Sequence, residues 1–226
     1  HTRDPWGELG RMASGLAWPA WGALESPFSA LALTIAVALW GTLVGVALGF
    51  PLALLFARSR LVRAGCAFVR AIHELFWALL FLQVFGLSAL TALAALAIPY
   101  AGIFAKVYAE ILEQTPRAPR DALPANSGRL ARFVYAELPL AWAQLAAYTR
   151  YRFECGLRAS VLLGFVGLPT LGFHLETAFR EGRYHEAGAL LWLFYLLIAS
   201  LPWWGHKRGR PRRRSAGGGR LGPGPI

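Results

Sequence analysis

Apolar residues gather in long stretches that are separated by short polar or basic segments. The longest, residues 29–57, exceeds the roughly 20 residues that a membrane-spanning helix requires. Four further apolar stretches follow it, over residues 71–86, 89–110, 138–166 and 187–204. Only "GLS" separates the second stretch from the third, so these two predict a helical hairpin. The pattern predicts an all-α membrane protein with about five transmembrane helices.

Basic residues are distributed unequally between the two sides of these predicted spans. One side carries fifteen of them: Arg58, Arg60, Arg63, Arg70, Arg117, Arg120, Arg129, Arg132, Lys207, Arg208, Arg210, Arg212, Arg213, Arg214 and Arg220. The other side carries Arg3, Arg11, Arg180 and Arg183. Because cytoplasmic loops are enriched in Lys and Arg, we expect the N-terminus outside and the C-terminus in the cytoplasm. The chain then divides into an outer segment (1–28), a membrane domain (29–204) and a basic, disordered tail (205–226).

The composition of the 226-residue chain agrees with a membrane protein. Hydrophobic residues make up 56% of it and charged residues only 15%, well below the share usual in soluble domains. The formal charge of +11 would suit nucleic acid, but apolar runs of this length exclude an ordinary nucleic-acid-binding domain.

Cys66 and Cys155 lie far apart, in or beside apolar segments, so we expect two unreactive thiols and neither a disulfide framework nor a zinc site.

The stretch "YTRYRFECGLRAS" (148–160) places four charges inside the fourth predicted span. On a helix, Arg150, Glu154 and Arg158 share one stripe, while Arg152 points about 160° away from its middle. Each charge at the bilayer centre costs about 2.5–3.5 kcal/mol, so these side chains must face protein or a water-filled path. They could form a buried ion-pair network or line a path for an anion. The excess of positive charge favours the path.

Two further polar pairs lie at the edges of predicted spans. His73 and Glu74 begin the second span, where His73 suits an interfacial histidine better than a ligand. Glu74 is a plausible partner for a cytoplasmic arginine or for one of the fourth span. Lys106 and Glu110 are four residues apart and predict a surface ion pair.

The loop at 113–138 carries the first resemblance to a known family. The chain has no G-x-x-x-x-G-K-[ST], HExxH or GxSxG motif and no Cys/His cluster. Its "RDALPANSGRLARFVYAELP" resembles the cytoplasmic motif of type I ABC importer permeases, which reads E-A-A, three residues, Gly, and closes on L-P. Asp121, Ala122 and Leu123 resemble the opening, with Asp121 in place of Glu, while Asn126 or Ser127 takes the glycine position, depending on the end from which one counts.

Two further segments narrow the resemblance to the phosphonate importer permeases. "YRFECGLRASVLLGFVG" is similar to their Y-R-[FW]-E, three residues, R-x-S-x-x-x-G-x-V-G, and "RAIHELFWALLF" is similar to their RAIPEL-x-WALIF. After Gly167 the family continues A-G-G-I-G, whereas this chain reads LPTLG. The resemblance covers roughly residues 30–204.

This resemblance implies a MetI-like fold and a transport subunit without enzymatic activity or a cofactor of its own. It places the substrate path at Arg150, Arg152, Glu154, Arg158, Glu74 and His73, and an outer gate at Gly164, Gly167 and Gly172. It places a coupling helix at Asp121, Ala122, Leu123, Asn126 and Gly128.

The implied partners are a cytoplasmic ABC ATPase that binds ATP, a periplasmic solute-binding protein and a second permease copy, identical or paralogous. The setting is the lipid bilayer of a bacterial inner membrane, with no nucleic acid. The same fold could instead import phosphite, phosphate or another small solute. A lipid-phosphate enzyme would need a nucleophile or metal beside the arginines, and a secondary transporter would usually show an internal repeat, which is not seen.

The predicted topology can be tested with reporter fusions. We expect fusions within residues 86–88 and at Gly182 to report an outside location, and fusions at Ser59, Ala125 and Gly209 to report a cytoplasmic one, because the basic segments stay inside. Paired alkaline phosphatase and fluorescent-protein fusions measure both locations. A reversed result at two or more sites would contradict the topology.

Overall fold

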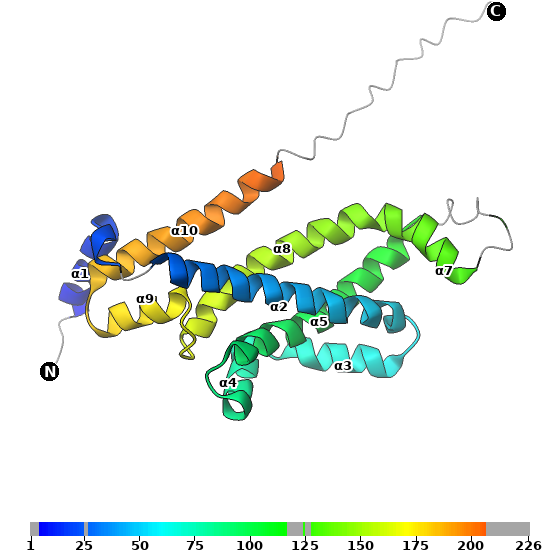
Figure 1. Cartoon of the computed structure of the whole chain (residues 1–226), viewed down its shortest axis with the longest axis horizontal. Helices are drawn as coiled ribbons and strands as arrows, with labels where there is room; N and C mark the ends of the chain where they lie inside the picture. The colour runs from blue at the N-terminus through cyan, green and yellow to red at the C-terminus, as the bar shows by residue number, and fades with distance from the viewer. Residues whose placement is uncertain (1–4, 25–26, 117–123, 125–127, 207–226) are drawn as a thin grey trace, which may run out of the picture.

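The computed structural model describes residues 5–24, 27–116, 124 and 128–206, and all regular structure in this part of the chain is helical. This confirms the all-α prediction. Figure 1 shows the order of the elements: α1 (Pro5–Ala17), a 3-10 turn η1 (Trp21–Ala23), α2 (Pro27–Phe56), α3 (Arg60–Ala71), α4 (Glu74–Phe85), α5 (Ala89–Gln114), α7 (Arg129–Arg132), a π-helical turn η2 (Phe133–Glu137), α8 (Leu138–Gly164), α9 (Leu171–Arg180) and α10 (Tyr184–His206).

Helices α2 and α5 form the centre of the bundle, with α8 against both. Three glycines of α2 face three large residues of α5 at the same four-residue spacing. A Cβ at Gly41 would come within 2.5 Å of Leu96, one at Gly45 within 2.8 Å of Tyr100, and one at Gly49 within 2.6 Å of Phe104. The glycines therefore let the two helices approach as closely as small residues do in membrane proteins.

The second predicted span differs from the structure. The expected single helix over 71–86 is wrong, because α4 begins only at Glu74 and, with 12 residues, is about 18 Å long. It follows α3 at a bend of 91°. His73 makes the break: its Nδ1 accepts a hydrogen bond from the Leu75 amide at 3.3 Å, and across the bend Trp77 Nε1 donates to the Val69 carbonyl at 3.2 Å. The segment counted as a cytoplasmic connection is thus largely the helix α3.

The hairpin between α4 and α5 is confirmed. Gly86 ends α4 with φ +64°, a conformation that favours glycine, and Ser88 caps α5 by accepting from the Thr91 amide at 3.3 Å. The Thr91 hydroxyl donates back to the Gly86 carbonyl at 2.6 Å. Within the described residues, α2 and α5 are each long and apolar enough to cross a membrane, and α3 with α4 would make a third span if taken together.

Helices α1, α9 and α10 gather at the end of the bundle opposite α7 (Figure 1). Helix α1 was not predicted within the outer segment, and it packs on α10. Tyr184 donates to Glu8 at 2.6 Å, and Trp192 Nε1 donates to the Leu16 carbonyl at 2.9 Å. Gly15 and Gly188 permit this contact, since a Cβ on either would clash with backbone atoms of the other helix.

The glycine register of α2 generates a stability prediction. We expect Gly45→Val to destabilise the bundle by about 1–3 kcal/mol or to prevent its assembly, because its Cβ would overlap Tyr100. The matched control is Gly65→Val, in α3, where an added Cβ meets nothing within 4 Å. Thermal unfolding of both variants in detergent measures the difference. Equal melting temperatures would contradict the close approach of α2 and α5.

Candidate functional site

The four predicted charges of α8 differ in their exposure. Arg150 and Arg158 are exposed, whereas Arg152 and Glu154 are half-buried. Within the described part of the chain, none of the four lies within 4.0 Å of an oppositely charged group. The ion pairing expected along the Arg150–Glu154–Arg158 stripe is therefore not formed among the described residues.

Arg152 is the member of this group that turns into the bundle. Its guanidinium carbon lies 4.3 Å from the centre of the Tyr100 ring, the distance of a cation–π contact. Tyr100 is fully buried. In the part of the chain that the structure describes, neither its hydroxyl nor Arg152 Nε has a hydrogen-bond partner, although both atoms are buried. The structure thus places a half-buried guanidinium with one buried, unpaired donor beside a second unpaired donor.

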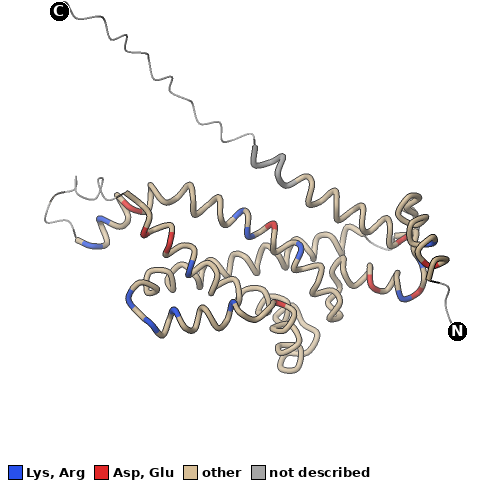
Figure 2. Tube along the Cα trace, turned by 180° about the vertical axis from the view of Figure 1, so that it is seen from behind, with Lys and Arg blue, Asp and Glu red and all other residues tan. Residues whose placement is uncertain are grey.

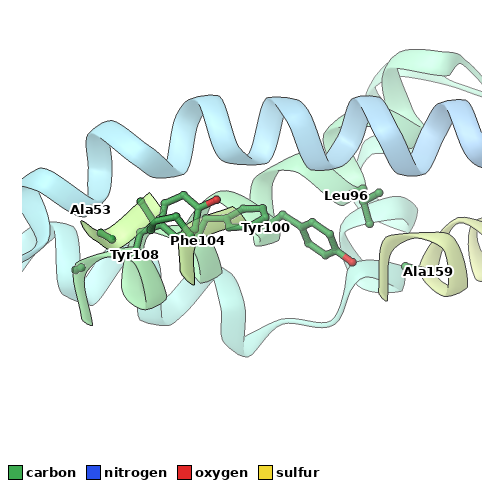
Figure 3. Close-up of a cluster of buried hydrophobic side chains, with 9 residues drawn as sticks. Ala53, Leu96, Tyr100, Phe104, Tyr108 and Ala159 are labelled. Carbon is green, nitrogen blue, oxygen red and sulfur yellow. The ribbon is translucent and has the colours of Figure 1, made fainter. Parts of the chain in front are cut away.

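The Tyr100 ring lies in a row of aromatic side chains on α5 and α8. Ring centres are 6.2 Å apart for Tyr100 and Phe104, and 5.2 Å apart for Phe104 and Tyr108. In Figure 3 the Tyr100 hydroxyl points away from Phe104 and toward Ala159 of α8. Gly156 of α8 lies beside this ring, since a Cβ there would be 3.6 Å from Tyr100, an ordinary van der Waals contact. No sequence motif singled out Tyr100; its only signal was a hydroxyl inside an apolar run.

Glu74 joins the same neighbourhood from the start of α4. The side chain is half-buried, and its charge acts electrostatically on the Tyr100 hydroxyl, as the charge of Arg152 does. His73 is exposed; it pairs with Glu74 at 3.4 Å and caps α4. Glu74 therefore lies within electrostatic range of Tyr100, but among the described residues it forms no ion pair with an arginine of α8, and His73 has a local structural role.

The three glycines predicted for the outer gate lie where α8 crosses α9. A Cβ at Gly164 would lie 2.6 Å from Thr170 Oγ1, and one at Gly172 would overlap the Val161 carbonyl. Gly167 has φ +98°, so it makes the turn between the two helices. A hydrogen bond connects this crossing to α2: the Leu171 amide of α9 donates to Thr34 Oγ1 of α2 at 3.0 Å. These residues have a packing role, and the gate itself stays a prediction.

The predicted coupling residues fall mostly outside the described part of the chain. Asp121, Ala122, Leu123 and Asn126 are outside it, and Gly128 directly precedes α7. At this end of the bundle, a cavity of about 230 Å³ opens between α2, α5 and η2. Its lining includes the carboxylates Glu113 and Glu137. The predicted ion pair of Lys106 with Glu110 is confirmed at 3.4 Å.

Comparison with known proteins gives curated relatives that are named as import permeases. No protein-family model matches the chain. The Phosphate-import permease protein PhnE of Mycolicibacterium smegmatis is 33% identical over 177 residues, which are 74% of this chain and 33% of that protein. The Phosphite transport system permease protein PtxC of Stutzerimonas stutzeri is 28% identical over 174 residues, 73% of this chain and 63% of that protein.

A third relative is shorter. The Putative cryptic phosphonate transport system permease protein PhnE2 of Escherichia coli is 29% identical over 108 residues, 47% of this chain and 88% of that protein. The chain spans about a third of the length of the mycobacterial relative and under two thirds of the phosphite relative.

Solved structures show the same fold at low sequence identity. An amino acid ABC transporter crystallised with histidines has a TM-score of 0.68 at 16% identity, covering 90% of this chain and 96% of the other. The MetNI methionine ABC transporter in an inward-facing conformation has a TM-score of 0.64 at 18% identity, covering 91% and 97%. The chain therefore has the MetI-like fold that its sequence resemblance implied.

Proposed function

We propose that the chain is an ABC transporter permease that forms the membrane path of an ATP-driven importer for a phosphonate-type anion, because it has the MetI-like fold and its relatives are named import permeases. The observation that carries this proposal is Arg152, whose guanidinium lies in the bundle against Tyr100 with its buried Nε unpaired. A charge in this position is costly unless something compensates for it. An anionic substrate would supply that compensation.

The chemistry of the site suits a tetrahedral oxyanion. A guanidinium presents a planar fork of donors that matches two oxygens of a phosphonate or phosphate, and it stays protonated at any physiological pH. The Tyr100 hydroxyl is a further unpaired donor beside it. Glu74 supplies a nearby negative charge, which would balance Arg152 while no substrate is bound.

Arg150 and Arg158 support a path shared between two copies. Both are exposed on α8, on a face that this chain does not cover. An exposed arginine within a predicted span needs water or protein around it. A second permease, identical or paralogous, would enclose a central path with these arginines facing it.

The remaining partners follow from the proposed family mechanism. A solute-binding protein would deliver the anion at the end of the bundle that holds α9, and a cytoplasmic ATPase would dock on the loop before α7. The names of the relatives favour a transport subunit over a lipid-phosphate enzyme. Phosphite is a second candidate substrate, because one relative carries that name.

The proposed role of Arg152 predicts a transport defect. We expect Arg152→Gln to lower anion uptake at least tenfold, because it removes the half-buried charge while keeping much of the volume, and Tyr100→Phe to lower it less. Uptake of radiolabelled methylphosphonate by reconstituted importer, normalised to inserted protein, measures this; Lys106→Gln, which removes a cation that is paired with Glu110, is the control. Parental uptake by Arg152→Gln would overturn the proposal.

The coupling loop generates a separate prediction. We expect Asp121→Arg, or deletion of residues 122–128, to abolish ATP-driven uptake while the chain still inserts into the membrane, because the ATPase would lose its docking site. Co-purification of the ATPase and uptake are measured on the same preparations. Full ATPase binding by the deletion variant would contradict the assignment of this loop.

A further inference from the structure

An apolar groove runs between α2, α3 and α5, away from Arg152. Its volume is about 490 Å³, and its lining consists of Leu48, Pro51, Leu52, Leu55, Val62, Gly65, Cys66, Val69, Ile98, Ala101 and Gly102. Small residues leave this space open. A Cβ at Gly65, for example, would meet nothing within 4 Å. On its floor the backbones of α3 and α5 come close, since a Cβ at Gly102 would lie 3.1 Å from the Cys66 carbonyl.

The groove opens on the outer surface of the bundle. Leu48 and Leu55 on its wall are 48% and 49% exposed, and two of its three helices, α2 and α5, are the ones long and apolar enough to span a membrane. Lipid tails surround such helices. If the groove were empty, the residues that line it would lose dispersion contacts. The bilayer itself provides acyl chains, and one of these can occupy the groove and restore the contacts.

Basic side chains stand at one end of this groove. Leu55 and Val62 mark that end, and Arg58, Arg60 and Arg63 lie at the adjoining turn and in the first turn of α3. All three are exposed, and none has a carboxylate within 4.0 Å among the described residues. Figure 2 shows Lys and Arg gathered at this turn with no acidic residue beside them.

From this juxtaposition we propose that the groove binds an anionic phospholipid. One acyl chain lies along Gly65, Ala101 and Gly102, and the headgroup phosphate is held by Arg58, Arg60 and Arg63. Basic pockets beside membrane helices attract anionic lipids by about 1 kcal/mol for each Lys or Arg near the surface. Arg152 has no part in this site, so the inference does not depend on the proposed transport function.

The test measures lipids that stay bound to the purified full chain. The protein is reconstituted in vesicles of equal parts phosphatidylglycerol and phosphatidylcholine, extracted in mild detergent, and its bound lipids are counted by native mass spectrometry. We expect the parent to retain phosphatidylglycerol preferentially. Arg60→Gln with Arg63→Gln should reduce this preference about thirtyfold, since two cations are lost.

A second variant tests the acyl-chain part of the site. Gly65→Phe adds a ring to the groove lining at a position where its Cβ meets no neighbour, and it should reduce retention of both lipids several-fold. Its control is Gly10→Phe in α1, where an added Cβ also meets nothing within 4 Å; the control for the arginines is Arg129→Gln. Both controls should retain lipid as the parent does.

Three results would overturn the proposal. Lipid retention by Gly65→Phe equal to that of Gly10→Phe would show that no acyl chain occupies the groove. An unchanged preference for phosphatidylglycerol in the double arginine variant would exclude the headgroup contact. Loss of self-association in Gly65→Phe with unchanged bound lipid would make the groove an interface between copies of the chain.

Discussion

The fit of three α2 glycines to three large α5 side chains is the interaction on which the rest of the bundle depends. Inside a membrane, lipid tails are as apolar as the helices, so helices associate through close packing and not through the hydrophobic effect. Gly41, Gly45 and Gly49 supply that packing by admitting Leu96, Tyr100 and Phe104 at contact distance. One register between the two helices satisfies all three pairs together.

That register also sets the geometry of the candidate site. Tyr100 is held against Gly45 on one side and lies near Gly156 of α8 on the other, so its ring has a fixed position between three helices. Arg152 then stacks on this ring, and α4 brings Glu74 into the same neighbourhood. Changing the α2–α5 contact would therefore move the surface against which Arg152 rests, even though no α2 glycine touches the arginine.

The long helices could be predicted from the sequence because apolar length alone identifies them. The hairpin of α4 and α5 followed from the short "GLS" connection, which Gly86 and Ser88 make into a turn and a cap. The break at His73 could not be predicted in the same way. It depends on a side-chain cap and on a hydrogen bond from Trp77 to Val69, eight residues apart, and neither leaves a trace in the hydropathy pattern.

For the site, helical periodicity predicted that Arg152 points away from Arg150 and Arg158, and this is what the structure has. Periodicity does not show which residues each face of the helix contacts. It therefore predicted neither the contact of Arg152 with Tyr100 nor the absence of an ion pair at Glu154 within the described ranges. The contact helps to explain how the bundle holds a cation without an adjacent carboxylate. A cation–π contact contributes about 0.5–2 kcal/mol, and the lower end suits a partly exposed cation such as Arg152, so the contact offsets only part of the roughly 2.5–3.5 kcal/mol that an arginine costs at the bilayer centre. Because the offset is incomplete and Nε stays unpaired, the proposed site retains a net attraction for an anion.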